Sequence, residues 1–287
     1  MLILNKIYIG FNALLGYIYK WLVDFHLLYV PNLQKNVNKN CVVSLTSYGR
    51  RVKTCVVYYT LISLLRQTVQ PDRIILWLAE SEWNDDTIPN KLRYLKKKGI
   101  EIYYCKDIKS YKKLIPTLQK YPNETIITVD DDIIYSKDTL STMLENHNIY
   151  KDDILCYVSR IPNSISGIPQ GYRKWKECKG GIEGMSIFPV GYGGTLYPAN
   201  SLHEYVCDEK LFMSLCPMAD DVWFWFCGIR KNTYKRCIEK KGHDLSFDSI
   251  YQFFHKGSAL THTNNLQDKN DNQIIELFNF FKYRLEE

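Results

Sequence analysis

The feature that most constrains this chain is a short apolar segment, residues 126–129, that runs directly into Asp130, Asp131 and Asp132. β-Branched residues favour strands, and an uninterrupted apolar run of this length suits a strand buried on both faces. In open α/β sheets, ligands bind at the carboxyl ends of the strands, where a carboxylate cluster is costly unless a positive group shares the site. Alternate side chains of an extended backbone share a face, so Asp130 and Asp132 are expected to point into one pocket. Such a pair suits an oxygen-preferring cation, Mg²⁺ or Mn²⁺.

The segments around this strand alternate in a way that predicts an α/β fold. The 287 residues are enough for one large α/β domain or two small ones. Alternating strands and helices imply a mostly parallel central sheet flanked by helices. Strands are expected at 42–45, 73–78, 100–104, 154–159 and 234–238, and helices at 52–67, 89–98, 110–120, 136–150, 220–229 and 271–285. Residues 160–190, rich in glycine, proline and polar side chains, are expected to form a long loop of the kind that often carries function.

Composition limits the class of protein and its partners. The chain is 46% hydrophobic and 24% charged, with a net charge of +6, which is typical of a globular protein with a modestly basic surface. This charge suits an anionic ligand or a bilayer surface, but it is too small to indicate nucleic-acid binding. The nine cysteines are scattered and include no Cys-x-x-Cys pair. Their spacing argues against a zinc ribbon and predicts reduced, mostly buried thiols in a cytoplasmic protein.

The N-terminal segment, residues 1–38, differs from the rest of the chain. Residues 1–30 are apolar and aromatic, but Lys6, Lys20 and Asp24 interrupt them. No stretch reaches the ~18 apolar residues of a spanning helix, and no small residues are placed as in a signal-peptide cleavage site. Two interpretations remain, a helix lying in the membrane interface and a helix packed on the domain. The polar linker at 32–40 favours peripheral membrane contact.

Several motifs occur in a specific order along residues 40–265. They are Val43-Ser44-Leu45-Thr46-Ser47-Tyr48, Ser63-Leu64-Leu65-Arg66-Gln67-Thr68 with Pro71-Asp72, Lys113-Leu114, the three aspartates, Gly191-Tyr192-Gly193-Gly194-Thr195-Leu196-Tyr197-Pro198, and Asp220-Asp221-Val222-Trp223. Together they resemble bacterial glycosyltransferases of the GT-A (Rossmann-like) fold, near the family-2-like enzymes of capsule and surface-polysaccharide synthesis. The resemblance implies a catalytic domain at 39–287, with a nucleotide-sugar half at about 39–135 and an acceptor half at about 136–270.

The resemblance implies a donor site that takes a nucleotide-diphosphate sugar. The residues expected to bind the nucleotide sugar are Thr46, Ser47, Tyr48, Arg51, Lys113, Asp130 and Asp131. A base could stack on Tyr48, and Arg51 and Lys113 could meet the diphosphate. A Mn²⁺ or Mg²⁺ ion would be held by Asp132, with Asp130 and His262 completing the metal site. The alternative for the aspartates is a role at the start of a helix.

The resemblance also implies an acceptor site and a catalytic base. Asp221 would be the general base of an inverting transfer, and Asp220 would contact acceptor hydroxyls. The expected acceptor or sugar contacts are Tyr192, Gly193, Gly194 and Trp223, because aromatic rings offer sugars an apolar face and glycines permit close approach. The acceptor would be a surface glycan or a lipid-linked sugar at the inner face of the cell membrane. A simpler interpretation of Asp220 and Asp221 is that they are the N-cap and a first-turn acid of the helix that follows them.

Two other functions stay open. One is a non-catalytic nucleotide- or glycan-binding protein of the same fold, and the other is a haloacid-dehalogenase-like phosphatase, which also places an Asp-x-Asp after a strand. The phosphatase is disfavoured because Asp220 and Asp221 follow Cys-Pro-Met-Ala instead of an apolar strand. The chain departs from the usual family-2 pattern in lacking a Gln-x-x-Arg-Trp motif. This absence disfavours a processive enzyme and favours the addition of single sugars.

Overall fold

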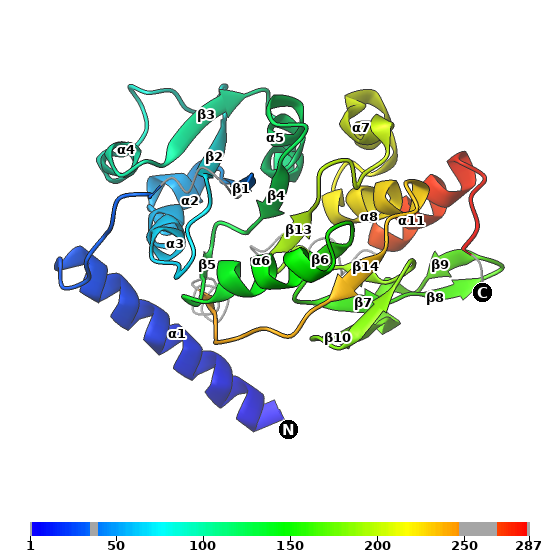
Figure 1. Ribbon diagram of the computed structural model, residues 1–287, viewed down its shortest axis with the longest axis horizontal. Helices are drawn as coiled ribbons and strands as arrows, with labels where there is room; N and C mark the ends of the chain where they lie inside the picture. Colours follow the sequence, from blue (N-terminus) through cyan, green and yellow to red (C-terminus); the bar gives the residue numbers. More distant parts are fainter. Residues whose placement is uncertain (1, 35–39, 247–268, 286–287) are drawn as a thin grey trace. The chain divides into compact units, whose positions relative to one another are not determined.

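The computed structural model describes residues 2–34, 40–246 and 269–285 (Figure 1). These residues divide into two compact units that interleave along the chain. Unit 1 takes its residues from Met1–Asp107, Asp130–Thr142 and Lys241–Ser258, and unit 2 takes its residues from Ile108–Val129, Met143–Lys240 and Ala259–Glu287. The expected nucleotide-sugar and acceptor halves are functional assignments and stay predictions.

A parallel sheet forms the centre of unit 1. Strands β1 (Cys41–Thr46), β2 (Arg73–Ala79) and β3 (Glu101–Cys105) pair in parallel in that order, with Ser44 opposite Ile75. The side chains of β1 and β2 are almost all buried. Continuous apolar strands of this kind are stable when both faces of the sheet are covered. The three strands lie where the sequence predicts them.

The helix expected at 52–67 is broken in the structure. It forms two helices, α2 (Gly49–Lys53) and α3 (Val56–Leu65), because Cys55 adopts a left-handed conformation with a φ of 58°. The prediction of a single helix at 52–67 was therefore wrong. Local propensity does not indicate such a break, since the left-handed region is unfavourable for residues other than glycine. Residues 57–65 of α3 are all buried, so tertiary packing fixes the position of the helix.

The other elements of unit 1 are helices α1 (Leu2–Asp24) and α4 (Asn90–Lys97) and a two-stranded pair. In that pair, β5 (Ile133–Ile134) and β15 (Leu245–Ser246) are antiparallel, and α1 contacts β15. The apolar N-terminal helix is therefore confirmed, with one face packed in unit 1. Within the parts of the chain that the structure describes, no helix is long and apolar enough to cross a bilayer.

Unit 2 contains a mixed sheet in the strand order β11-β14-β6-β13-β4. The strands are β4 (Thr125–Thr128), β6 (Ile154–Cys156), β11 (Ile182–Gly184), β13 (Thr195–Tyr197) and β14 (Lys235–Cys237). β14 and β6 are parallel, whereas the other neighbours in this sheet are antiparallel. The expected α/β fold is thus confirmed, with parallel pairing in unit 1 and mixed pairing in unit 2.

The prediction of a long loop at 160–190 is wrong, because this region forms short strands. They are β7 (Ser159–Ile161), β8 (Asn163–Ile165), β9 (Ile168–Gln170), β10 (Lys176–Cys178), β11 and β12 (Phe188–Pro189), with a short helix η2 (Tyr172–Lys174). β8 and β9 form a hairpin whose turn residues, Ser166 and Gly167, have φ values of 51° and 73°. Two positive φ values are typical of the tight turns that join hairpin strands. The Ser-Gly dipeptide between two isoleucines was the sequence signal for this hairpin.

The remaining helices are η1 (Lys109–Lys113), α5 (Ile115–Lys120), α6 (Thr139–Ile149), η3 (Glu204–Cys207), α7 (Glu209–Leu215), α8 (Asp220–Arg230) and α11 (Lys269–Phe280).

An aromatic core in unit 2 holds α8 in place. Trp225 lies 5.3 Å from Phe188 and 5.7 Å from Phe278, measured between ring centroids. Each buried ring of this size contributes about 2–3 kcal/mol to stability. The core therefore fixes the helix that begins with Asp220 and Asp221.

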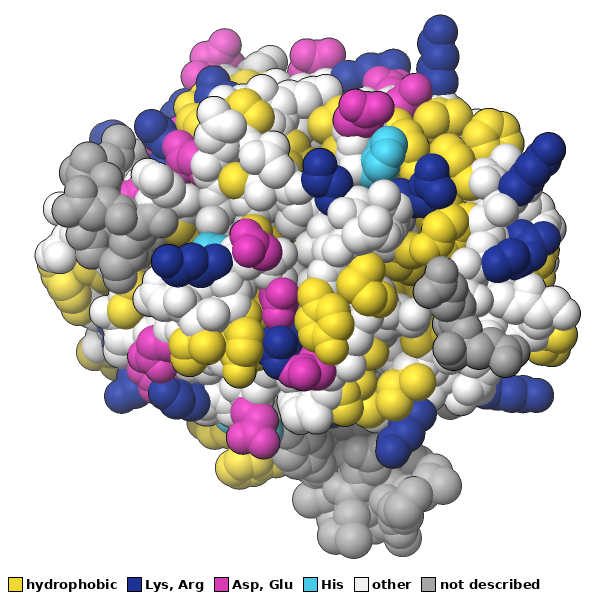
Figure 2. Space-filling view, turned by 45° about the vertical axis from the view of Figure 1, so that its right-hand side comes forward, with side chains coloured by type: hydrophobic (Ala, Val, Ile, Leu, Met, Phe, Trp, Pro, Cys, Tyr) yellow, Lys and Arg dark blue, Asp and Glu magenta, His cyan; other side chains and the backbone are white. Residues whose placement is uncertain are grey.

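The surface carries charges of both signs. Figure 2 shows lysine and arginine side chains interspersed with acidic ones on the face in view. Among the described residues on that face, the basic side chains form no continuous stripe of the kind that follows a nucleic-acid backbone.

The nine cysteines carry free thiols that are buried or half-buried.

Candidate functional site

The aspartate run lies in a turn and not in extended backbone. β4 ends at Thr128, and Asp131 and Asp132 form a turn before β5 begins. Because the backbone is not extended there, the alternation that would place Asp130 and Asp132 on one face does not apply. The structure instead brings Asp131 and Asp132 together on one cation, Arg51. Alternation therefore gives no support for a shared face here, and a shared pocket for Asp130 and Asp132 stays a prediction.

Arg51, on α2, supplies the positive charge that this carboxylate cluster needs. Its Nη1 lies 2.5 Å from Asp131 Oδ1 and its Nη2 lies 3.0 Å from Asp132 Oδ2. Asp131 is only 4% exposed, and its Oδ2 accepts a hydrogen bond of 2.5 Å from the hydroxyl of Ser47. The hydroxyl of Thr60 donates to the backbone carbonyl of Asp131 at 2.9 Å. A buried carboxylate that is paired and hydrogen-bonded in this way fixes the turn against β1, α2 and α3.

The other residues expected at the donor site have different surroundings. The ring of Tyr48 is 44% exposed and lies 5.6 Å from the Arg51 guanidinium carbon. The hydroxyl of Thr46 donates to the carbonyl of Trp77 at 2.9 Å. The backbone N–H of Asp130 donates to the hydroxyl of Tyr135 at 2.8 Å. The residues that the structure gathers are Ser47, Tyr48, Arg51, Asp131 and Asp132, here called the arginine–aspartate cluster.

The carboxylates of this cluster provide the oxygen ligands that Mg²⁺ and Mn²⁺ prefer. Asp131 is engaged by Ser47 and Arg51, and Asp132 shares Arg51. Within residues 2–34, 40–246 and 269–285, no three His, Cys, Asp or Glu side chains are arranged to hold a metal ion. His262, the expected third ligand, lies outside the described residues. Asp130 and Asp132 therefore have the right chemistry for a metal ion, and completing its coordination requires other groups.

A second charged cluster lies in unit 2 at the start of α8. Asp220 and Asp221 are the first residues of the helix, and no side chain caps it at Ala219. The carboxylates have other partners instead. Asp220 Oδ1 accepts a hydrogen bond of 2.8 Å from the hydroxyl of Ser110. Lys113 Nζ lies 2.8 Å from Asp220 Oδ2, an ion pair without hydrogen-bond geometry. Neither aspartate is therefore the N-cap, but both lie in the first turn of α8, as the simpler interpretation includes.

Asp221 has the surroundings of a proton acceptor. Its Oδ2 accepts a hydrogen bond of 3.1 Å from the backbone N–H of Gly191, and its Oδ1 lies 3.3 Å from Lys113 Nζ. Burial raises the pKa of the Asp221 carboxyl above its ordinary value, the Lys113 ammonium lowers this pKa, and the Asp220 charge raises it. The side chain is still 29% exposed. A reachable carboxyl group with a raised pKa is suited to general-base chemistry.

Gly191 is required for this arrangement. A Cβ atom at its position would lie 2.7 Å from Asp221 Oδ1 and 3.0 Å from Lys113 Nζ. Only glycine lets the backbone N–H come within hydrogen-bond distance of the carboxylate. Close backbone approach therefore occurs at Gly191, toward a side chain of the same chain, and the approach of the neighbouring glycines to a sugar stays a prediction. Ser110, Lys113, Gly191, Asp220 and Asp221 are here called the lysine–aspartate cluster.

The residues expected at the acceptor site divide into two groups. Tyr192 is 47% exposed, and Gly193 and Gly194 have φ values of 87° and 111°. Their contact with a sugar stays a prediction. Trp223, by contrast, is fully buried, and its indole N–H donates to the carbonyl of Val206 at 2.9 Å. Trp223 is therefore a core residue in this structure, which does not fit the acceptor contact expected of its side chain.

Sequence reasoning missed Ser110 and the partners of Lys113. Lys113 was expected to meet a diphosphate, whereas the structure pairs it with Asp220 and Asp221. The sequence offered little signal, because the burial of Lys113, which is only 7% exposed, is known from the structure alone. Lysine is rarely buried without a partner, so a buried lysine here implies a nearby carboxylate.

Comparisons with known proteins find distant structural likenesses. No protein-family model matches the chain, and no curated protein matches it. The chain is similar to S. aureus TarS 1–349, at 14% identity over 84% of this chain and 72% of that chain, with a TM-score of 0.47. It is also similar to the mannosyltransferase PcManGT from Pyrobaculum calidifontis in complex with GDP-Man and Mn²⁺, at 14% identity over 53% of this chain and 45% of that chain, with a TM-score of 0.33. A third similar structure is a 4-diphosphocytidyl-2C-methyl-D-erythritol synthase, at 9% identity over 57% of this chain and 76% of that chain, with a TM-score of 0.37. All three likenesses have low identity and TM-scores below 0.5, so they assign neither a family nor a reaction to this chain.

Proposed function

We propose that this protein is a metal-dependent glycosyltransferase that moves a sugar from a nucleotide-diphosphate sugar to a hydroxyl group. The observation that carries the proposal is the setting of Asp221, a reachable carboxylate held between the Gly191 N–H and the Lys113 ammonium. A carboxylate whose pKa is raised by burial can accept a proton from an acceptor hydroxyl during attack. The order of the sequence motifs supports the same reaction class.

In the proposed reaction, Asp221 accepts the proton of the acceptor hydroxyl while that oxygen attacks the anomeric carbon of the donor sugar. The bond from this carbon to the phosphate oxygen breaks, and its electron pair leaves with the nucleoside diphosphate. A single displacement of this kind inverts the anomeric centre. Lys113 lies close enough to keep Asp221 ionised before the proton is taken. Asp220, Tyr192 and the neighbouring glycines would contact the acceptor.

The arginine–aspartate cluster would bind the donor. The exposed ring of Tyr48 offers a surface on which a nucleobase can stack, and Arg51 can approach a diphosphate. Asp131 would act indirectly, because it holds Arg51 and Ser47 in place. A divalent cation would be held by Asp130 and Asp132 together with His262, and when bound it neutralises the charge that develops on the leaving diphosphate.

The acceptor in this proposal is a surface glycan or a lipid-linked sugar, reached from the cytoplasmic face of the membrane. Nine free thiols suit a reducing compartment, in agreement with a cytoplasmic location. The exposed apolar residues of α1 are compatible with work at a membrane surface.

The proposal is tested by calorimetric titration of a panel of nucleoside diphosphates, with and without Mn²⁺. The proteins are the wild type, Asp132→Asn, Asp221→Asn and the exposed control Asp152→Asn. We expect one nucleotide to bind in a Mn²⁺-dependent manner, with binding lost in Asp132→Asn and kept in the other two variants. Asp221→Asn should lose the transfer of sugar to an acceptor, whereas the control Asp152→Asn should keep it.

Three results would count against parts of this proposal. Failure of every nucleotide to bind, in either condition, would remove the transferase interpretation. Nucleotide binding without turnover on any acceptor would favour the non-catalytic binding protein. Unchanged turnover in Asp221→Asn would show that another group is the base.

A further inference from the structure

Helix α1 exposes an apolar stripe on the side opposite to its buried face. Phe11, Leu14, Ile18 and Trp21 recur at spacings of three and four residues, so they lie along one side of the helix, and Phe25 continues the spacing in the turn that follows α1. Each of these side chains is 46–61% exposed. These five residues are here called the α1 stripe. Exposed apolar surface of this extent is uncommon on monomers and marks a place of interaction.

The opposite side of α1 is buried. Val23 is only 3% exposed, although Trp21, two positions earlier, is 53% exposed. Gly16 is buried as well. The helix therefore packs in unit 1 through one face, and the α1 stripe is left uncovered by this packing.

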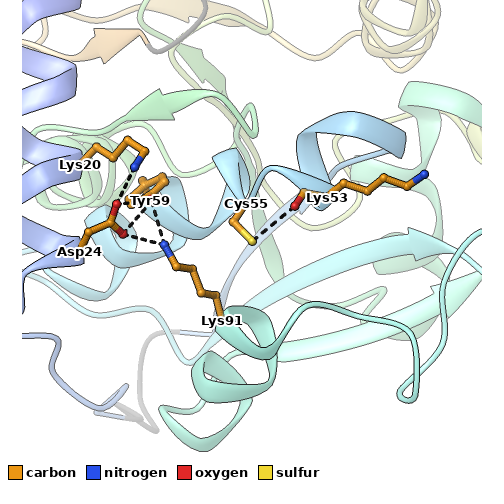
Figure 3. Close-up of polar contacts among 6 residues, drawn as sticks. All are labelled: Lys20, Asp24, Lys53, Cys55, Tyr59 and Lys91. Carbon is orange, nitrogen blue, oxygen red and sulfur yellow. Dashed lines mark hydrogen bonds and ion pairs between the residues drawn. The ribbon is translucent and has the colours of Figure 1, made fainter.

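A charged network fixes the C-terminal end of α1 to two helices of unit 1 (Figure 3). Asp24 accepts hydrogen bonds from Lys20 Nζ at 2.5 Å, from Lys91 Nζ on α4 at 2.6 Å, and from the Tyr59 hydroxyl on α3 at 2.8 Å. Burial opposes ionisation of Asp24, but hydrogen bonds from Lys20, Lys91 and Tyr59 outweigh it and lower the pKa of this carboxyl to about 2. At neutral pH the network is therefore charged, and it holds the α1 stripe in a fixed orientation.

The same network leaves a positive charge beside the α1 stripe. Two ammonium groups face one carboxylate, and the side chains of Lys20 and Lys91 are 40% and 42% exposed. Asp24 is the sole acidic residue in the sequence of α1. A hollow next to this charge is lined by Tyr17, Ile18, Lys20, Trp21, Asp24 and Phe25. Apolar and aromatic groups bordered by cations match the surface of a bilayer that contains anionic lipids.

We propose that the α1 stripe is the surface by which this protein docks on an anionic lipid bilayer, with α1 lying along the interface. Tryptophan and tyrosine are enriched at the level of lipid headgroups, and Trp21 and Tyr17 lie on this side of the helix. A second copy of the helix is the competing occupant. Paired helices carry complementary charges beside a narrow apolar seam, whereas the flanks of the α1 stripe include Leu15, Tyr17 and Leu22. The broad apolar side favours lipid.

The inference deepens the membrane location given under the proposed function. It does not depend on the transfer reaction, because vesicle binding is measured without a nucleotide sugar. Loss of one activity with retention of the other therefore tells the two proposals apart.

Trp21 is a built-in reporter for the test. The chain has six tryptophans, and the other five are at most 7% exposed. Full-length protein is mixed with vesicles of phosphatidylcholine alone or of phosphatidylcholine with phosphatidylglycerol. We expect a blue shift of tryptophan emission and cosedimentation with the anionic vesicles. Trp21→Phe should lose the blue shift and still cosediment, since phenylalanine preserves the apolar surface.

A second variant tests the α1 stripe itself. The double variant Ile18→Gln, Trp21→Gln should weaken binding to anionic vesicles by at least about tenfold. The control double variant Tyr94→Gln, Ile149→Gln removes exposed apolar side chains elsewhere and should bind like the wild type. Thermal melting checks that each variant is folded.

Any of three results would overturn the inference. The first is a wild-type protein that fails to cosediment with anionic vesicles. The second is a stripe variant that binds these vesicles as well as the wild type. The third is a wild-type dimer in analytical ultracentrifugation that the stripe variant abolishes while vesicles are not bound, which would assign the α1 stripe to a second copy of the chain.

Discussion

Lys113 and Asp221 form an ion pair in which the ammonium nitrogen lies 3.3 Å from the carboxylate oxygen Oδ1. Gly191 closes the other side of the carboxylate with its backbone N–H, at 3.1 Å from Oδ2. Asp220 lies next to Asp221 in the first turn of α8 and adds a second negative charge. The protonation of Asp221 therefore depends on a balance between burial and the Asp220 charge, which raise its pKa, and the Lys113 ammonium and the Gly191 N–H, which lower it.

The Lys113→Met variant tests this balance. The ammonium lowers the pKa of Asp221, so its removal should raise that pKa further above the ordinary carboxyl range. If Asp221 acts as the ionised base, the acid limb of the kcat/KM profile should move to higher pH. Measuring transfer rates across pH for the wild type and Lys113→Met checks this. Lys97→Met, an exposed residue of α4, serves as the control. An acid limb that stays in place would contradict the assignment.

Asp131 and Asp132 should differ in their effect on stability. Asp131 is the more buried carboxylate, with a side chain 6% exposed against 15% for Asp132, and it binds both Arg51 and Ser47. Asp131→Asn should lower the free energy of unfolding by about 2–4 kcal/mol, because it weakens a buried ion pair. Asp132→Asn should cost about 1 kcal/mol or less. Urea denaturation of both variants measures the difference, and equal losses would show that Asp131 does not anchor the turn.

The burial of Lys235 should make the stability of the protein depend on pH. It is fully buried, with its Nζ donating to the carbonyls of Met185 at 2.7 Å and Thr233 at 3.0 Å. Burial lowers the pKa of Lys235 to about 7, whereas a lysine in the unfolded chain has a pKa of about 10.4. Between these values the unfolded state binds more protons, so the free energy of unfolding should rise with pH by at most about 1.4 kcal/mol per pH unit. Lys235→Met should lose this rise in urea denaturation series across the same range, and parallel curves for the two proteins would contradict it.

Trp223 is predicted to serve stability more than acceptor binding. Trp223→Phe removes the hydrogen bond to the Val206 carbonyl and leaves that buried oxygen without its partner. Together with the lost volume, this should lower the free energy of unfolding by about 2–3 kcal/mol. Trp21→Phe, at an exposed position, should have almost no effect on stability. A large rise in the acceptor KM of Trp223→Phe without a loss of stability would instead place Trp223 at the acceptor.

Much of the fold was predictable because its elements carry local signals. The strands β1 and β2 follow from apolar runs that contain β-branched residues, and β3 follows from a short run of isoleucine and tyrosine. The start of α8 at Asp220 follows from acidic residues ahead of an apolar segment. The errors occurred where local signals were weak. Cys55 breaks one expected helix through a left-handed backbone, and the hairpin at Ser166–Gly167 is held by pairing of strands too short to show a pattern.

The sequence by itself determined the α/β class, the apolar N-terminal helix and the presence of two acidic motifs, because periodicity and residue type are local properties. The tertiary structure alone decided which charges meet. It turned the backbone at Asp131 and Asp132 toward Arg51, and it placed Lys113 beside Asp221. A buried charge must find a partner within a few ångströms, and residues 80 or 108 positions apart become neighbours only when the chain folds.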